Sequence, residues 1–292
     1  MPRVTELPAA DHGRQAAARS VPDAARRLPI LMYHEISAEP RLAGRLAVTP
    51  SRFAWQLGCL RDGGYTALRA EAARPALSTA GRPPARPVVL TFDDGFADFH
   101  DVALPLLSAY GLTATLFVST GWIADGTRTG PARARRRTRR PAGTLSWRQI
   151  EEAAGAGIEI GSHSVSHPQL DQLGANELKA ELAESKGLLE DRLGVAATGL
   201  SYPFGYFDQT VRDTAAALGY QYACAVGNRL AAPRDDPFAL PRLTIGRPTG
   251  RQAFENVVRT GRLPAEFLGY RALATGYAAL RHARRELNRI RR

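Results

Sequence analysis

The sequence has little cysteine and no long apolar run, and each absence removes a class of protein. The two cysteines, Cys59 and Cys224, stand too far apart for a thiolate metal site or a disulfide framework. No stretch approaches the roughly 18 consecutive apolar residues of a transmembrane helix. The first 28 residues hold no apolar run long enough for a secretory signal peptide, which predicts a cytoplasmic protein.

Acidic residues are scarce in two segments, and these segments account for the net charge of +11. Seven arginines and no acid lie between Arg128 and Arg140, and seven arginines with one glutamate lie between Arg271 and Arg292. The two segments carry +13, so the rest of the chain carries −2 and is nearly neutral. A nucleic-acid groove built into the fold is therefore disfavoured, and basic attachments that touch a polyanion or an anionic membrane stay open.

What is present is an ordinary globular composition. With 292 residues, 44% of them apolar and 23% charged, the chain can bury a sizeable core, which excludes wholesale disorder and a collagen-like fibre. Polar residues 1–27 predict a flexible tail, residues 28–250 a folded domain, and residues 251–292 a basic helical C-terminal extension. That extension either docks on the domain or lies on an anionic membrane. The Arg/Pro/Gly-rich segment 126–143 predicts a mobile surface loop.

Short apolar runs alternate with amphipathic stretches from Leu28 onward. The runs are continuous, as in strands buried on both faces: Pro29–Tyr33, Val88–Phe92, Ala114–Val118, Ile158–Ile160, Gly199–Tyr202, Tyr220–Val226 and Leu243–Ile245. The predicted helices include Ser51–Gly63, Trp147–Ala156, Ala175–Leu193 and Asp208–Leu218. This alternation predicts an α/β fold with a parallel sheet. Seven strands favour a barrel near (β/α)7 or (β/α)8, and the pattern alone does not exclude an open sheet.

Two histidines directly follow one predicted strand. His163 and His167 stand four residues apart after Ile158–Ile160, a spacing that lets both imidazoles converge on one point. Such a pair is a common way to hold Zn²⁺ or a similar cation. The alternative is two unrelated surface histidines.

Two adjacent carboxylates follow another strand. Asp93 and Asp94 come at the end of Val88–Phe92, and the carboxyl ends of parallel strands carry the active site in such folds. Adjacent buried carboxylates repel each other, and a cation would relieve the repulsion. The alternative is a helix cap and a solvated neighbour in a turn closed by Gly95.

The two pairs support each other, because both follow strands that run in the same direction and should emerge at one end of the barrel. One aspartate with two histidines makes three protein ligands. A fourth position then stays open for water, which is the composition of a catalytic metal site.

The order of these motifs resembles the polysaccharide deacetylase family (NodB-homology domain, carbohydrate esterase family 4). Thr91-Phe-Asp-Asp-Gly95 is followed by His163-Ser-x-x-His167, and the likeness spans about residues 28–247. The resemblance implies a distorted (β/α)7-type barrel that hydrolyses N-acetyl groups on a carbohydrate. It implies that Asp94, His163 and His167 ligate Zn²⁺ or another divalent ion such as Co²⁺, Ni²⁺ or Mn²⁺, with Asp93 as general base.

The third motif of the family has an arginine before the proline and an aromatic residue after it. Here it reads Ser201-Tyr-Pro-Phe-Gly205. The resemblance implies that the Phe204 N–H faces the oxyanion and that Tyr202, Pro203 and Gly205 contact the substrate.

The sequence departs from the family in two places. Ser201 replaces the arginine that orients the base, and no histidine follows Leu243–Ile245 to act as general acid. We assign the acid to His34, which ends the first predicted strand, because first and last strands are neighbours in a barrel. The Met-Tyr-His segment there resembles the permuted subgroup that acts on poly-N-acetylglucosamine-type glycans. His34 as a buried structural histidine is the alternative.

Three other functions remain open at this point. The same fold with a degraded site would be a non-catalytic glycan-binding protein, and the same site chemistry would also suit an O-acetyl esterase. The third is association with nucleic acid through the two arginine segments, which salt-dependent DNA retention would test.

Overall fold

The computed structural model describes residues 26–39, 43–78, 84–125, 143–265 and 267. The predicted tail, the loop 126–142 and most of the C-terminal extension therefore lie outside the described residues. None of the described helices is long and apolar enough to cross a membrane.

Seven parallel strands close into a barrel, which confirms the (β/α)7 prediction. In spatial order they run β1, β8, β7, β6, β5, β4 and β3, and the ring closes because β1 also pairs with β3. The strands are β1 (Ile30–Tyr33), β3 (Pro87–Phe92), β4 (Thr115–Val118), β5 (Glu159–Ser162), β6 (Gly199–Ser201), β7 (Tyr222–Val226) and β8 (Leu240–Thr244). Each predicted apolar run forms one of these strands.

One further strand was not predicted. β2 (Thr66–Leu68) pairs only with β3 and stays outside the ring, at an edge. It has three residues and none of them is fully buried, so it lacks the continuous apolar run that marks the other strands.

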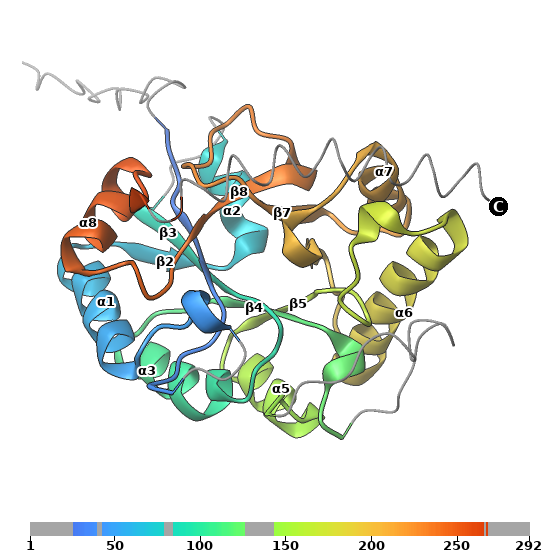
Figure 1. Ribbon diagram of the computed structural model, residues 1–292, viewed down its shortest axis with the longest axis horizontal. Coiled ribbons are helices and arrows are strands. Elements are labelled where there is room, and N and C mark those ends of the chain that lie inside the picture. The colour runs from blue at the N-terminus through green and yellow to red at the C-terminus, as the bar shows by residue number, and fades with distance from the viewer. Residues whose placement is uncertain (1–25, 40–42, 79–83, 126–142, 266, 268–292) are drawn as a thin grey trace, which may run out of the picture.

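Helices surround the strands (Figure 1). They are α1 (Pro50–Asp62), α2 (Ala73–Leu77), α3 (Leu104–Ala109), α5 (Trp147–Gly155), α6 (Ala175–Leu193), α7 (Gln209–Ala217) and α8 (Arg251–Thr260). Side chains cap the starts of three of them: Thr49 for α1, Ser146 for α5 and Asp208 for α7. The four predicted helices are present, and α6 has the predicted bounds.

Aromatic side chains pack between the barrel and α1. Tyr33 and Phe92, which end the paired strands β1 and β3, stack at 5.2 Å between ring centroids, and Phe53 of α1 meets both rings edge-on. α8 packs beside α1, with Phe254 against Trp55. This packing fixes the ends of β1 and β3, the strands that precede His34 and Asp93.

A partly buried carboxylate with neutral partners lies at the amino end of the barrel. Glu159 begins β5 and accepts hydrogen bonds from the Tyr222 hydroxyl at 2.6 Å, the Thr115 hydroxyl at 2.7 Å and the Glu71 N–H at 3.1 Å. Burial raises the pKa of Glu159 above its usual value.

Candidate active site

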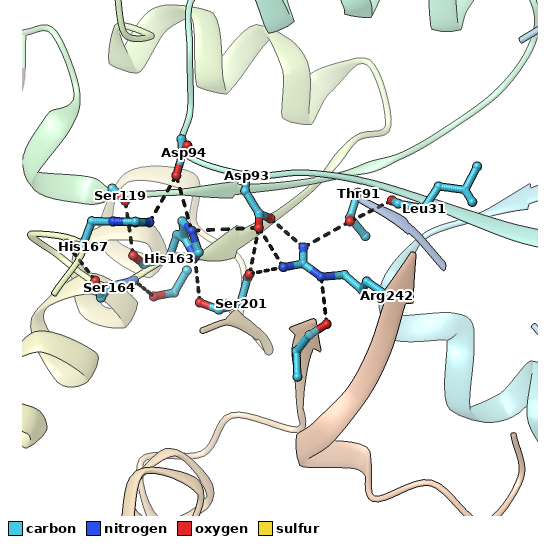
Figure 2. Close-up of polar contacts among 12 residues, drawn as sticks. Leu31, Thr91, Asp93, Asp94, Ser119, His163, Ser164, His167, Ser201 and Arg242 are labelled. Atoms are coloured by element: carbon cyan, nitrogen blue, oxygen red, sulfur yellow. Dashed lines mark hydrogen bonds and ion pairs between the residues drawn. The ribbon is translucent and has the colours of Figure 1, made fainter. Parts of the chain in front are cut away.

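The predicted site residues meet at the carboxyl end of the barrel. Asp93 and Asp94 follow β3, His163 follows β5 and His34 follows β1. The chain turns sharply after β3, because Asp94 and Gly95 both have positive φ, 77° and 80°. This turn sends the two neighbouring carboxylates in different directions, as Figure 2 shows.

The Asp94 carboxylate faces both histidines. Its Oδ1 atom lies 3.4 Å from Nε2 of His163 and 3.3 Å from Nε2 of His167. One ligand atom from each of the three residues lies within 4.8 Å of the other two. The structure therefore brings together the three residues that the motifs single out as metal ligands.

The donor set fits a divalent cation. Two ligands bonded at about 2.0–2.1 Å to one tetrahedral zinc ion lie about 3.3 Å apart, close to the separations around Asp94 Oδ1. That oxygen is buried and accepts no hydrogen bond among the described residues. It is an orphaned acceptor of the kind that a cation would satisfy.

The histidine rings are oriented for ligation through Nε2. Nδ1 of His163 lies 2.7 Å from the Ser201 carbonyl oxygen, so Nδ1–H donates there and the Nε2 lone pair stays available. The His167 ring packs between Trp122 and Phe204, at 5.0 Å and 4.6 Å between centroids. Burial lowers the pKa of His167 to about 4, with a further contribution from His163, which keeps the imidazole neutral at pH 7.

Asp93 pairs with Arg242, and its Oδ2 atom lies 3.9 Å from Nε2 of His163, as Figure 2 shows. The Arg242 guanidinium donates to Oδ1 of Asp93 at 2.6 Å and to Oδ2 at 2.7 Å, and both residues are buried. The Ser201 hydroxyl donates to Asp93 at 3.2 Å and accepts from Arg242 at 2.9 Å. Burial is the largest single influence and raises the pKa of Asp93, but Arg242, His163 and His34 together outweigh burial and hold the pKa well below its usual value.

Arg242 is the functional residue that the sequence reasoning missed. It comes from β8, whereas the family motif places an arginine at the position of Ser201 on β6. The guanidinium reaches the base from a different strand, and the small Ser201 side chain leaves room for it. A signal was present, because Arg242 stands within a buried strand and a buried charge needs a partner.

The third motif forms a tight turn at the rim of the site. Phe204 has φ 61°, and the turn's own hydrogen bonds run from Gly205 N–H to Tyr202 C=O and from Tyr206 N–H to Pro203 C=O. Neither bond uses the Phe204 N–H. The Phe204 ring is 53% exposed, beside His167.

The structure places the other three predicted substrate contacts, Tyr202, Pro203 and Gly205, within the same turn. Tyr202 is buried, stacks on Phe207 and donates its hydroxyl proton to the Phe238 carbonyl at 2.9 Å. Pro203 is buried, and Gly205 has φ 73°, with room for no Cβ because Val226 lies too near. These residues shape the turn that carries Phe204.

His34 lies in the same cluster of charges. Its pKa responds to Asp94, Asp93, Arg242 and His163, although burial is the largest influence and lowers it. Its buried Nδ1 atom has no hydrogen-bond partner among the described residues. β1 does pair with β8, which is the neighbour relation on which its assignment depends.

Comparison with known proteins agrees with this geometry. The family model for polysaccharide deacetylase matches residues 80–223. A Bacillus subtilis protein named "Putative polysaccharide deacetylase YxkH" is 30% identical over 228 residues, which cover 78% of this chain and 75% of that protein. The poly-β-1,6-N-acetyl-D-glucosamine N-deacetylase of Staphylococcus aureus is 21% identical over 188 residues, 61% of this chain and 60% of that protein.

A solved structure is also similar. The Streptococcus pyogenes deacetylase PplD, in complex with acetate, superposes with a TM-score of 0.70 at 30% identity, covering 81% of this chain and 99% of that one. Fold, motif order and sequence identity over most of both chains agree, so the chain belongs to the polysaccharide deacetylase family.

Proposed function

We propose that this protein is a metal-dependent hydrolase that removes N-acetyl groups from a carbohydrate. The observation that carries the proposal is that two adjacent carboxylates have different partners. Asp94 faces His163 and His167 with an unsatisfied oxygen, while Asp93, next to His163, is held by Arg242.

A divalent ion bound by Asp94, His163 and His167 would supply Lewis acidity, which polarises a carbonyl and lowers the pKa of water. Asp93 is the general base of the proposal. Its low pKa keeps it ionised throughout the physiological range. Arg242 and the Ser201 hydroxyl together donate three hydrogen bonds to Asp93, and a carboxylate offers about four lone-pair sites, so Asp93 can still accept a proton from the attacking water.

Phe204 and His34 have the two remaining roles in the proposed hydrolysis, which are oxyanion stabilisation and protonation of the leaving group. In the proposal, the backbone N–H of Phe204 donates to the oxyanion that forms as water adds to the amide carbonyl. His34 gives the departing amine its proton. Because burial lowers its pKa, protonated His34 gives up its proton more readily than a free imidazolium does.

Two observations support a substrate class: the activities named for the relatives, and the exposed Phe204 ring at the edge of the site. One relative is a poly-β-1,6-N-acetyl-D-glucosamine N-deacetylase, and another, 28% identical over 130 residues, is a chitin deacetylase of Cryptococcus neoformans. The exposed Phe204 ring offers an apolar face to a sugar beside the metal trio. We therefore propose an N-acetylated amino sugar, within a glycan, as the substrate.

The deciding experiment measures acetate and free amine together. The protein is stripped of metal, reloaded with Zn²⁺, Co²⁺, Ni²⁺ or Mn²⁺, and incubated with oligomers of N-acetylglucosamine in β-1,4 and β-1,6 linkage. We expect equal amounts of acetate and amine from the loaded protein and none from the stripped protein. His167→Gln, which removes one ligand, is the matched control and should neither retain metal nor release acetate.

Two results would contradict the proposal. Metal binding with glycan retention but no acetate would indicate a non-catalytic glycan-binding protein. Acetate released only from O-acetylated sugars, with no new amine, would indicate an esterase.

A further inference from the structure

The loop that carries both metal-ligating histidines has a conformation that its own sequence does not favour. In residues 163–167, here called the histidine loop, Ser164 has φ 63° and His167 has φ 56°. Neither residue is glycine, and positive φ in other residues persists only where the surroundings enforce it. Something outside the loop must therefore hold it.

A buried carboxylate of α6 lies directly behind the loop. Oε2 of Glu181 accepts the N–H groups of Val165 and Ser166, both at 2.9 Å, and Oε1 accepts the Ser166 hydroxyl at 2.5 Å. Successive backbone N–H groups beside a left-handed residue form a concave nest that binds anions. In this protein Glu181 itself supplies the anion.

Glu181 makes no other contact that explains its position. Its side chain is 1% exposed, and within the described part of the chain every hydrogen bond that it accepts comes from the histidine loop. A buried carboxylate is unfavourable unless its hydrogen bonds compensate for lost water. The neighbouring Ser185 of α6 also contacts this region, through a 2.8 Å hydrogen bond to Ser162.

The opposite side of the loop is held by backbone hydrogen bonds and by the Ser119 hydroxyl, which donates to the His163 carbonyl at 3.2 Å. Thr120 N–H donates to the Ser164 carbonyl at 3.1 Å, and Gly121 N–H donates to the Val165 carbonyl at 2.8 Å. A Cβ atom on Gly121 would lie only 2.7 Å from that Val165 oxygen, so the approach requires glycine. The loop is therefore clamped between this turn and Glu181.

We propose that Glu181 is a positioning residue of the metal centre, whose carboxylate fills the nest of the histidine loop and sets the spacing of His163 and His167 before an ion binds. The inference rests on the metal site proposed above. It concerns the free energy of binding the ion and not the chemical step, so it is tested without substrate.

The main variant is Glu181→Met, which keeps the length of the side chain and leaves two buried N–H groups without an acceptor. Zn²⁺ affinity is measured by competition with a chromophoric chelator, with Co²⁺ absorption as a second probe of ligand geometry. We expect affinity to fall by roughly 10–100-fold, the usual effect of losing a group that orients metal ligands. In the metal-free protein, hydrogen exchange of the Val165 and Ser166 amides should accelerate.

Three variants in the same helix separate positioning from other effects. Glu181→Gln keeps an acceptor oxygen for both N–H groups and should restore most of the affinity. Glu184→Gln removes the same charge from an exposed position, and Leu189→Ala destabilises the buried face away from the loop. Neither should change Zn²⁺ affinity or the exchange of the two amides.

Several results would overturn the inference. They are unchanged affinity in Glu181→Met, an equal loss in Leu189→Ala, or a loss in Glu181→Gln as large as that in Glu181→Met. If Glu181→Met does not fold, Glu181→Asp takes its place, because it keeps the charge but is too short to span the nest, and wild-type affinity in that variant would be equally decisive. If the wild-type protein binds no metal, the proposed function fails, and the exchange data alone still show whether Glu181 holds the loop.

Discussion

Each end of the barrel holds a carboxylate, buried at Asp93 and partly buried at Glu159, and the two carboxylates have partners of opposite kinds. Asp93 at the carboxyl end is paired with the Arg242 guanidinium, while Glu159 at the amino end accepts hydrogen bonds from two hydroxyls and one backbone N–H. The pKa of Asp93 is lowered and that of Glu159 is raised. The barrel therefore favours the ionised form of Asp93, where the chemistry is proposed, and disfavours the ionised form of Glu159 at the opposite end.

The largest expected effect is at Asp93. Asp93→Asn should lower turnover roughly 10²–10⁴-fold, because the amide cannot accept the water proton. Metal affinity should stay unchanged, since Asp94, His163 and His167 are intact. Acetate release and metal content, measured on one preparation, check both statements, and substantial turnover in this variant would remove Asp93 from the role of base.

The Arg242 pairing is tested by stability. Arg242→Met should lower the free energy of unfolding by about 3–5 kcal/mol in urea denaturation, because it leaves the buried Asp93 charge without its partner. The double variant Asp93→Asn/Arg242→Met should lose less than the sum of the single losses. Strict additivity would mean that the two groups do not stabilise each other.

The role of His34 is tested by changing the leaving group. His34→Ala should lower turnover of an N-acetylated sugar by about 10²-fold, at the low end of general acid effects. Hydrolysis of p-nitrophenyl acetate should fall much less, because the phenolate leaves without a proton. Equal losses on both substrates would assign His34 a role other than that of acid.

The smallest effect is at Glu159. Its pKa is raised in the folded state, so the stability it contributes is present below its usual pKa, near 4.3, and is lost as pH rises through the folded value. Glu159→Gln should flatten that loss in denaturation curves measured above about pH 4, without a change in turnover.

The stability that Asp93 contributes should depend on pH in the opposite direction in the same denaturation series. Its folded pKa is lowered, so the stability that it contributes is present above its usual pKa, near 3.9, and is lost as pH falls. If Glu159→Gln and Asp93→Asn changed the pH profile in the same direction, the contrast between the two ends would be wrong.

Much of this arrangement was accessible from the sequence because its signals are local. The apolar runs predicted all seven barrel strands, and the short edge strand β2 was missed because its three residues are only partly buried. Asp93 with Asp94, and His163 with His167, each lie within five residues of chain directly after a strand. Their convergence required only that parallel strands end at the same side of the barrel.

The direction of each side chain in the third motif was not accessible from the sequence. Ser201 and Tyr202 are successive residues, and successive side chains in an extended segment point to opposite sides. Ser201 therefore reaches Asp93 and Arg242, while Tyr202 packs outward against Phe207. The motif names both residues without indicating which one enters the barrel.

The sequence by itself determined the strands, the order of the motifs and the identity of the candidate ligands, because apolar runs and short spacings are properties of a few consecutive residues. Only the tertiary structure decided which cation holds Asp93 and which anion holds the histidine loop. Arg242 is 149 residues from Asp93 along the chain, and Glu181 approaches the loop from a separate helix. Those contacts arise from barrel closure and helix packing, which no local pattern encodes.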